Sequence, residues 1–135
     1  MKISVLKSYS KLNIQLGVLG LYKSNLHKIE SLVTFANIYD LIYISETKSK
    51  YHKVKFFGKF GKGIPKENTI FKLLKIIDNM KLLNGRKFSI RIKKKIPLKS
   101  GMGGGSMNAA TILNFLMKKN YFRLSKKQAN DLCFK

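Results

Sequence analysis

Four glycines fall within five residues late in this 135-residue chain, at positions 101 and 103–105. Glycine has no side chain, so a backbone this rich in glycine can curl where other residues would clash. Residues 88–92, before the cluster, alternate apolar and polar side chains as a strand does, and helical spacing begins at about Ser106. A glycine loop between a strand and a helix brings consecutive N–H groups to the positive end of the helix dipole, which predicts a phosphate cradle.

The predicted cradle includes residues on both sides of the glycines. Pro97 ends the strand, the ammonium of Lys99 adds a cation, and the hydroxyl of Ser106 adds a further polar group. A plain flexible turn would not account for the flanking strand and helix. The residues predicted to bind phosphate are Pro97, Leu98, Lys99, Ser100, Gly101, Met102, Gly103, Gly104, Gly105, Ser106 and Met107.

Three well-known nucleotide-binding loops fit this segment less well. A Walker loop ends in Gly-Lys-Ser/Thr, and no lysine follows Gly105. A dinucleotide fingerprint has its last glycine where Ser106 stands and begins in the first turn after the strand, whereas residues 97–100 intervene here. A protein-kinase loop also has glycine at that position, and no His-Arg-Asp sequence occurs.

The rest of the chain predicts an α+β fold in one domain over residues 1–135. Periodicity predicts strands over about 2–9, 11–19, 27–36, 41–44, 54–57 and 88–92, and helices over about 69–80, 106–119 and from 125 onward. Asn68 or Thr69 is predicted to cap the first helix, and Ser125 the last. This order is not a regular βαβ alternation.

Two groups of polar residues stand out on the predicted strands. Lys11 and Asn13 share the polar face of residues 11–19. Lys94 has the parity of the apolar residues at 88, 90 and 92, so it is predicted to point toward the core and to need a polar partner there.

The formal net charge of +22, from 28 basic and 6 acidic residues, raises the possibility of nucleic-acid binding. Three of the basic residues are arginines, and the lysines are scattered, which favours a solvated lysine coat over a nucleic-acid surface. No apolar run is long enough for a membrane span or a signal peptide, and Cys133 has no partner for a disulfide. A cytoplasmic protein is therefore expected.

Three segments, in one order, resemble the GHMP kinases. The segment 97–111 is similar to their ATP-binding signature, the segment 8–13 (Ser-Tyr-Ser-Lys-Leu-Asn) resembles the first motif of the diphosphocytidyl-methylerythritol kinases, and Asn68-Thr69-Ile70 fits the same family. The resemblance covers nearly all of the chain and about the first half of such a kinase. It implies the N-terminal domain of this family, a mixed sheet with helices packed on one side, which is also found in ribosomal proteins.

The resemblance implies a small-molecule kinase that uses ATP and Mg²⁺. The family transfers the γ-phosphate of ATP to a hydroxyl of diphosphocytidyl-methylerythritol, on the non-mevalonate route to isoprenoid precursors. Lys11 matches the lysine beside the acceptor hydroxyl, where an ammonium would stabilise developing negative charge. Asn13 would reach the same pocket as Lys11. Mg²⁺ would arrive on ATP, with Ser106 as a possible contact, and no protein metal site is expected.

Further roles follow from the resemblance. His27 matches a histidine that contacts the cytosine ring, while Leu26 stands where the family usually has a tyrosine that could stack on it. Lys94 matches a lysine by the adenine pocket, and Asn68 is a second candidate there that helix capping would also explain. No membrane partner is expected, and the oligomeric state is left open.

The catalytic aspartate of the family lies in a Gly-(Ala/Ser)-Asp-Val-Pro stretch that residues 1–135 do not contain. A second domain would also be absent from these residues, so we expect them to have little or no kinase activity and to expose apolar surface. Two alternatives remain open: a nucleotide-binding remnant without catalysis, and a basic nucleic-acid-binding domain.

Overall fold

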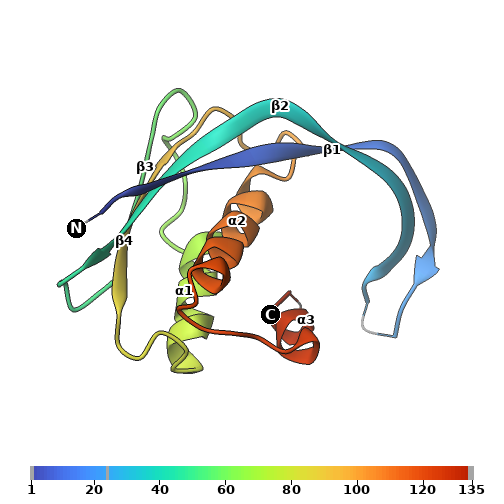
Figure 1. Ribbon diagram of the computed structural model, residues 1–135. Coiled ribbons are helices and arrows are strands. Elements are labelled where there is room, and N and C mark those ends of the chain that lie inside the picture. Colours follow the sequence, from blue (N-terminus) through green and yellow to red (C-terminus); the bar gives the residue numbers. More distant parts are fainter. Residues whose placement is uncertain (1, 24, 134–135) are drawn as a thin grey trace.

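The computed structural model describes residues 2–23 and 25–133. The described elements, in order, are β1 (Ser4–Leu21), β2 (His27–Thr47), β3 (Lys53–Phe57), α1 (Thr69–Asn79), β4 (Lys87–Lys93), α2 (Gly104–Lys118) and α3 (Lys126–Cys133). The strands form a sheet in the order β1-β2-β4-β3, with β3 parallel to β4 and the other neighbours antiparallel. Helices α1 and α2 lie on one side of this sheet (Figure 1), which confirms the predicted α+β class.

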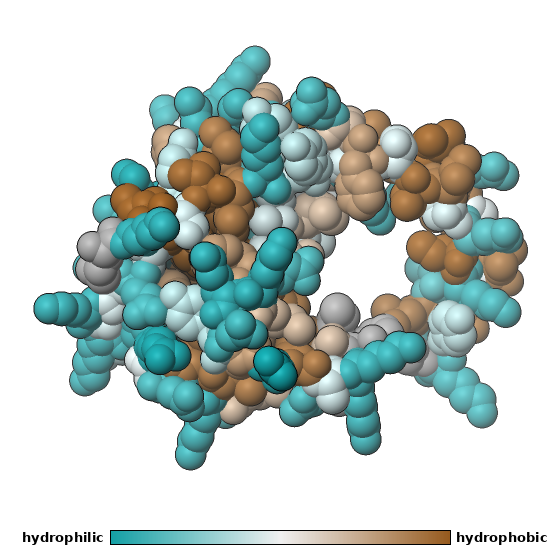
Figure 2. All heavy atoms as spheres, viewed as in Figure 1, coloured by the Kyte–Doolittle hydropathy of each residue, from teal (hydrophilic) through white to brown (hydrophobic). Residues whose placement is uncertain are grey.

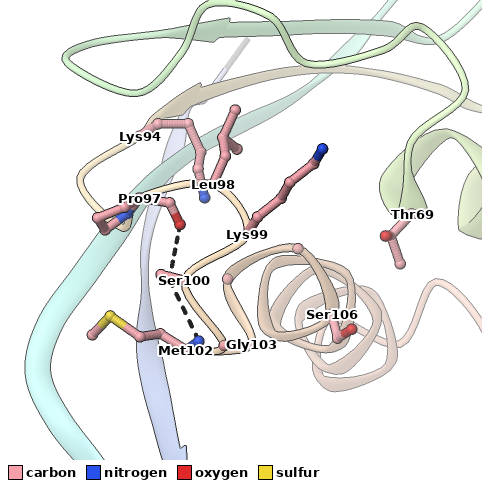
Figure 3. A pocket seen from close by; sticks show the side chains of 12 residues that line it. Thr69, Lys94, Pro97, Leu98, Lys99, Ser100, Met102, Gly103 and Ser106 are labelled. Carbon is pink, nitrogen blue, oxygen red and sulfur yellow. Dashed lines mark hydrogen bonds between the residues drawn. The ribbon is translucent and has the colours of Figure 1, made fainter.

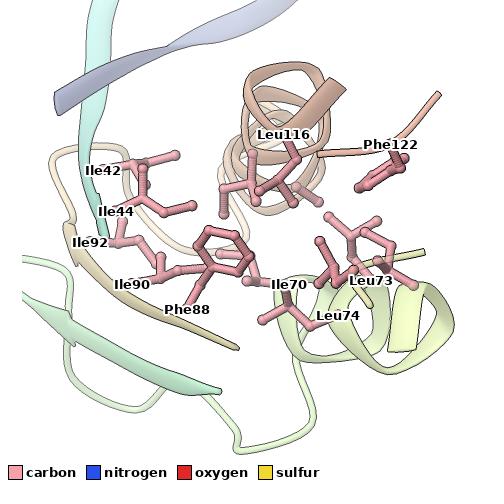
Figure 4. Packing of buried hydrophobic residues seen from close by; sticks show 14 residues of the cluster. Ile42, Ile44, Ile70, Leu73, Leu74, Phe88, Ile90, Ile92, Leu116 and Phe122 are labelled. Atoms are coloured by element: carbon pink, nitrogen blue, oxygen red, sulfur yellow. The ribbon is translucent and has the colours of Figure 1, made fainter. Parts of the chain in front are cut away.

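The hydrophobic core lies between the sheet and helices α1 and α2. Alternate residues of β2 and β4 are buried on the same face, because successive side chains of a strand point to opposite sides. Each fully buried aliphatic side chain of this kind contributes about 1.5–3 kcal/mol to stability. Figure 4 shows the strand residues Ile42, Ile44, Phe88, Ile90 and Ile92 against the helix residues Ile70, Leu73, Leu74 and Leu116.

The first two strands are much longer than predicted. The predicted strands over 2–9 and 11–19 are one strand, β1, and those over 27–36 and 41–44 are one strand, β2. Bulges between Tyr9 and Ser10, between Asn13 and Gln15 and between Val18 and Gly20 absorb the irregular alternation that suggested breaks. In the turn before His27, Asn25 has a positive φ of 60°.

The distal part of this hairpin, residues 12–35, is called the arm below. It extends past helices α1 and α2 and then bends round (Figure 1), and Figure 2 shows a hollow between it and the body of the domain. Large apolar side chains are exposed along it, as monomeric proteins seldom allow in one region. They include Ile14, Leu16, Val18, Leu21, Ile29, Leu32, Val33 and Phe35. The expected exposure of apolar surface is therefore found, and it is concentrated on the arm.

Helices α1 and α3 begin at the predicted N-caps, whereas α2 begins earlier than predicted. Asn68 caps α1, and Ser125 forms a capping box with Gln128, in which each side chain accepts the backbone N–H of the other residue. Helix α2 begins at Gly104 and not at Ser106. Its N-cap is Gly103, whose left-handed backbone (φ 67°) lets the chain enter the helix directly from the loop.

None of the helices in residues 2–23 and 25–133 combines the length and the apolar character needed to span a bilayer.

Candidate functional site

The glycine loop has left-handed backbone at every second residue. Lys99, Gly101 and Gly103 have φ angles of 56°, 73° and 67°. Repeated left-handed residues of this kind turn neighbouring N–H groups toward one concavity, which is an anion-binding arrangement. The Ser100 hydroxyl donates to the Pro97 carbonyl at 3.0 Å and accepts from the Met102 N–H at 3.4 Å, so it holds the loop closed from within (Figure 3).

A cleft of about 230 Å³ lies along this loop. It is lined by Thr69, Lys94 and all ten residues from 97 to 106. The structure thus brings the predicted residues 97–106 to one place. The N–H groups in the first turn of α2 have no partners within the helix and lie at its positive end. The cleft therefore combines free donors, a helix dipole and lysines, which suits a bound phosphate chain.

Thr69 also lines the cleft, although its sequence context had pointed to a helix cap and a family motif and not to a binding residue. Its Oγ1 lies 3.5 Å from the position that a Cβ on Gly105 would take, so α1 and α2 present their first residues to the same cleft. Ser106 lines the cleft and is exposed there. Met107 does not line it, and instead contacts the underside of the loop, 3.6 Å from a Cβ built on Gly103.

Lys94 is 3% exposed, which confirms that it points inward. Its partner is Asp40, fully buried at the same junction, and the two side chains form a direct ion pair. Lys94 Nζ also lies 3.2 Å from the position of a Cβ on Gly104, directly under the start of α2. The predicted lysine is thus in contact with the cleft, but its charge is already balanced by a carboxylate.

Sequence reasoning missed Asp40, because the sequence holds only one part of the signal, the parity of this residue along its strand. Asp40 has the parity of the buried Ile42 and Ile44 in β2, as Lys94 has that of the buried residues of β4. Leu41 of β2 pairs with Lys93 of β4. Since the two strands are antiparallel, moving one residue further along each places Asp40 opposite Lys94. Two inward-facing charges of opposite sign on neighbouring strands predict a buried pair.

Lys11 of β1 lies against the glycine loop. Its backbone N–H donates to the Met102 carbonyl at 3.0 Å, and its Cβ lies 3.7 Å from a Cβ built on Gly103. The segment 8–13 and the glycine loop, far apart in the sequence, are therefore adjacent. Asn13, two residues further out along β1, is on the arm, and its Oδ1 accepts from the Ser31 hydroxyl at 3.2 Å.

The structure does not bring Leu26 and His27 to the cleft. Both are exposed, and His27 is the first residue of β2, paired with Leu21 at the far end of the arm. Lys11, by contrast, pairs with Phe35 near the base of the arm. The predicted cytosine contacts are thus separated from the cradle by the length of the arm (Figure 1).

A second, smaller hollow adjoins the cleft and shares Thr69, Lys94, Leu98 and Gly105 with it. Its other lining residues are Phe56, Ile64, Asn68, Ile70 and Asn108. Asn68 is fully engaged at its edge. Its Oδ1 accepts from the N–H groups of Ile70 and Phe71, both at 3.1 Å, and its Nδ2 donates to the carbonyls of Pro65 and Lys66.

A separate polar cluster joins α1, the start of β4 and the loop before β3. His52 Nδ1 accepts from the Phe88 N–H at 3.0 Å, and its Nε2 lies 3.2 Å from Asp78 Oδ1, while Lys87 Nζ lies 2.5 Å from Asp78 Oδ2. Burial lowers the pKa of His52 from its ordinary value of 6.5, and Asp78 opposes this only in part. Burial acts to raise the pKa of Asp78, but hydrogen bonds from Lys87 and His52 lower it overall.

Comparison with known sequences gives a consistent family. Residues 68–135 match the family described as GHMP kinases N terminal domain. The chain is 52% identical over 127 residues to the 4-diphosphocytidyl-2-C-methyl-D-erythritol kinase of Pelagibacter ubique, and 35% identical over 134 residues to that of Alkaliphilus metalliredigens. These alignments cover 94% and 98% of this chain but 45% of each kinase. The chain therefore spans about half the length of these relatives.

Solved structures agree on the fold. A 4-(cytidine 5'-diphospho)-2C-methyl-D-erythritol kinase superposes with a TM-score of 0.69 at 21% identity, over 96% of this chain and 46% of that one. A homoserine kinase from Cytophaga hutchinsonii superposes with a TM-score of 0.63 at 13% identity, over 96% of this chain and 39% of the homoserine kinase chain.

Proposed function

This chain belongs to the GHMP kinases, and from that premise we propose that it forms the ATP-binding part of a kinase acting on 4-diphosphocytidyl-2-C-methyl-D-erythritol. The reaction would transfer the γ-phosphate of ATP to a hydroxyl of that small molecule, in isoprenoid precursor synthesis in the cytoplasm. The relatives that are 52% and 35% identical to this chain are named as kinases of that small molecule. The observation that supports it most directly is the contact between Lys11 and the glycine loop.

In this proposal the glycine loop holds the phosphates of ATP. The N–H groups of the loop and of the first turn of α2 donate to phosphate oxygens, and the dipole of α2 favours their negative charge. Lys99 and Ser106 add an ammonium and a hydroxyl at the rim of the cleft. The cleft is small for a whole nucleotide, so it suits the triphosphate while the base lies elsewhere.

The adjoining hollow is our candidate for the adenine ring. Phe56, Ile64 and Leu98 give it apolar walls, and it opens into the phosphate cleft through shared residues. Asn68 and Lys94 line it as well, in agreement with the roles that the family resemblance implies for them. An apolar pocket with a few polar groups at its rim suits a flat heterocyclic base.

Mg²⁺ would bind mainly through the nucleotide. In the part of the chain that the structure describes, the cleft is lined by the hydroxyls of Thr69 and Ser106 and by no carboxylate. These groups fit a cation brought in on the phosphates and leave most of its coordination to phosphate oxygens and water. Bound there, Mg²⁺ would neutralise charge on the β- and γ-phosphates.

The acceptor side of the site would be the base of the arm. Lys11, beside Gly103, is placed to stabilise charge on the transferred phosphoryl group and the acceptor oxygen, with Asn13 further along the same strand. Leu26 and His27 would meet the cytidine end of an extended substrate. Because none of the described residues that line the cleft carries a carboxylate, we expect residues 1–135 to bind ATP but to transfer phosphate slowly.

The test is a calorimetric titration of this chain with ATP and Mg²⁺. We expect saturable binding that Lys99→Ala weakens by about tenfold, the value of one charge-assisted contact. Lys118→Ala is the matched control, because Lys118 is exposed in the last turn of α2, at the opposite end of that helix from the glycine loop. Absence of binding, or equal loss in both variants, would overturn the proposed site. Rapid turnover of substrate by residues 1–135 would contradict the expected low activity.

The net charge of +22 supports one alternative, non-specific binding of nucleic acid by the lysines of the surface, which Figure 2 shows to be largely hydrophilic. Such binding would fall steeply with salt and would respond equally to Lys99→Ala and Lys118→Ala. Binding of a short RNA with that behaviour, in the absence of ATP binding, would favour this alternative.

A further inference from the structure

The Asp40 carboxylate is contacted by donors from two segments that lie on opposite sides of the glycine loop. On the near side, which is the segment just before the loop, Oδ1 accepts the backbone N–H groups of Lys95 and Ile96, at 2.7 and 2.9 Å. On the far side, which is the helix after the loop, Oδ2 accepts from Asn108 Nδ2 of α2 at 2.9 Å. Lys94 Nζ contacts the same Oδ2.

These contacts enclose the whole of the loop. Lys95 and Ile96 are the last residues before Pro97, and Asn108 lies just beyond the first turn of α2. Asp40 is fully buried and Asn108 is 1% exposed, so water cannot readily replace either partner. Hydrogen bonds to a buried charge are stronger than neutral ones, because the surroundings screen them less.

We propose that Asp40 is a positioning residue for the phosphate cradle, which fixes the spacing between the strand before the glycine loop and the helix after it. Glycines supply the loop with conformational freedom, and a loop that is free to move would bind phosphate poorly. By holding both ends, one carboxylate limits that freedom while it stays out of the cleft. The inference rests on the nucleotide binding proposed above only where affinity is concerned.

Asp40 also balances the charge of Lys94, whose ammonium is buried beneath the start of α2. An ammonium under the first turn of α2 faces the positive end of the helix dipole, which is unfavourable for a cation. The carboxylate offsets this charge, so that the ammonium can remain buried beneath Gly104. The ion pair and the two-sided contact therefore serve the same junction.

The experiment compares Asp40→Asn with Asp78→Asn in this chain. Asp78 is a matched control, since it also accepts from a lysine and a second side chain but lies in the cluster with His52 and Lys87. An asparagine at position 40 can accept through one atom only, and its amide nitrogen would meet the donors of Lys94 or of Asn108. The variant therefore loses the ion pair with Lys94, and its contacts on both sides of the loop become neutral hydrogen bonds, which are weaker than those to a carboxylate.

The first readout is amide hydrogen exchange of residues 95–108, at a temperature where circular dichroism shows every variant folded. We expect exchange there to be about tenfold faster in Asp40→Asn than in Asp78→Asn, which corresponds to the loss of one contact to a charged group. The second readout is ATP affinity, expected to be about tenfold weaker in Asp40→Asn and unchanged in Asp78→Asn. Equal exchange in the two variants would overturn the proposal.

Asn108→Ala serves if Asp40→Asn does not fold. It leaves the ion pair in place and removes only the far-side contact, so we expect faster exchange in the first turns of α2 and weaker ATP binding. Unchanged exchange in this variant would also count against the proposal. If the unsubstituted chain binds no ATP, the proposed function fails, yet the exchange measurement still decides whether Asp40 positions the loop.

Discussion

The backbone N–H of Lys11 donates to the carbonyl of Met102 at 3.0 Å, so the middle of β1 is fastened to the centre of the glycine loop. The contact uses main-chain atoms and therefore does not depend on the lysine side chain. It leaves that side chain half-buried beside Gly103, at the rim of the proposed phosphate site. Fold and function can thus be separated at this position by substitution.

Lys11→Ala is expected to weaken ATP binding with little effect on folding. The substitution removes an ammonium near the phosphates, worth about tenfold in affinity, and keeps the bond to Met102. Titration calorimetry and urea unfolding measure the two quantities. Lys28→Ala, at an exposed position on the arm, is the control for the loss of one positive charge. Equal affinities in the two variants would show that Lys11 does not face the nucleotide.

Gly104→Ala and Gly105→Ala are expected to change stability in opposite directions. A Cβ on Gly104 would lie 3.2 Å from Ile96 Cγ2 and from Lys94 Nζ, both buried, and such crowding costs about 1–3 kcal/mol. A Cβ on Gly105 would meet only Thr69 Oγ1 at 3.5 Å, an ordinary contact. Alanine is a better helix former than glycine by about 0.5–1 kcal/mol, so the second variant should gain stability.

Urea unfolding of the two glycine variants measures this difference in free energy directly. Both substitutions add the same methyl group to the first turn of α2, so each is the control for the other. A loss of stability of similar size in both would mean that the loop, and not the contact with Ile96 and Lys94, limits what these positions tolerate.

Much of this site could be predicted from the sequence because its parts are local. The glycine loop, the cap at Asn68 and the strand that precedes Lys94 each depend on neighbours within a few residues. The inward direction of Lys94 followed from strand parity alone. Asp40 was missed because its meaning depends on which strands pair and in which register, and parity within one strand does not contain that information.

For the arm, the sequence pattern predicts the strand but not its burial. Alternation along residues 11–19 predicts a strand with one apolar face, and such a face is normally buried. Here Ile14, Leu16 and Val18 are exposed, because the arm leaves the domain before the helices can cover it. A sequence pattern shows that a face is apolar, but the surface that covers it is set by the rest of the fold.

Asn68→Ala is expected to lower the free energy of unfolding by about 1–2 kcal/mol, the usual cost of losing a helix cap. Both N–H groups that its Oδ1 accepts belong to the first turn of α1. Asn68→Asp keeps the acceptor at the cap and adds a negative charge at the positive end of the helix, but it loses the bonds that Nδ2 donates to Pro65 and Lys66, so its loss of stability should be smaller than that of Asn68→Ala. Thermal unfolding followed by circular dichroism compares them, and equal losses would rule out capping as the main role.

The stability of the domain should fall as the pH decreases below about 6.5, because of His52. Burial holds the pKa of this imidazole below 6.5 in the folded state, so the unfolded chain takes up a proton first. The stabilisation from neutral His52 is therefore complete above pH 6.5 and is lost as the pH falls through the lower folded pKa. Asp78, whose pKa is lowered from 3.8, adds a second loss below that value.

Urea unfolding at about pH 7 and about pH 5 tests this, with His52→Gln as the comparison. Glutamine can still accept the Phe88 N–H that His52 Nδ1 accepts, but it does not titrate. We expect the difference in unfolding free energy between the two pH values to be smaller in the variant. His27→Gln, at an exposed position on the arm, controls for the substitution itself. A pH dependence in His52→Gln as steep as in the unsubstituted chain would assign the acid sensitivity to other groups.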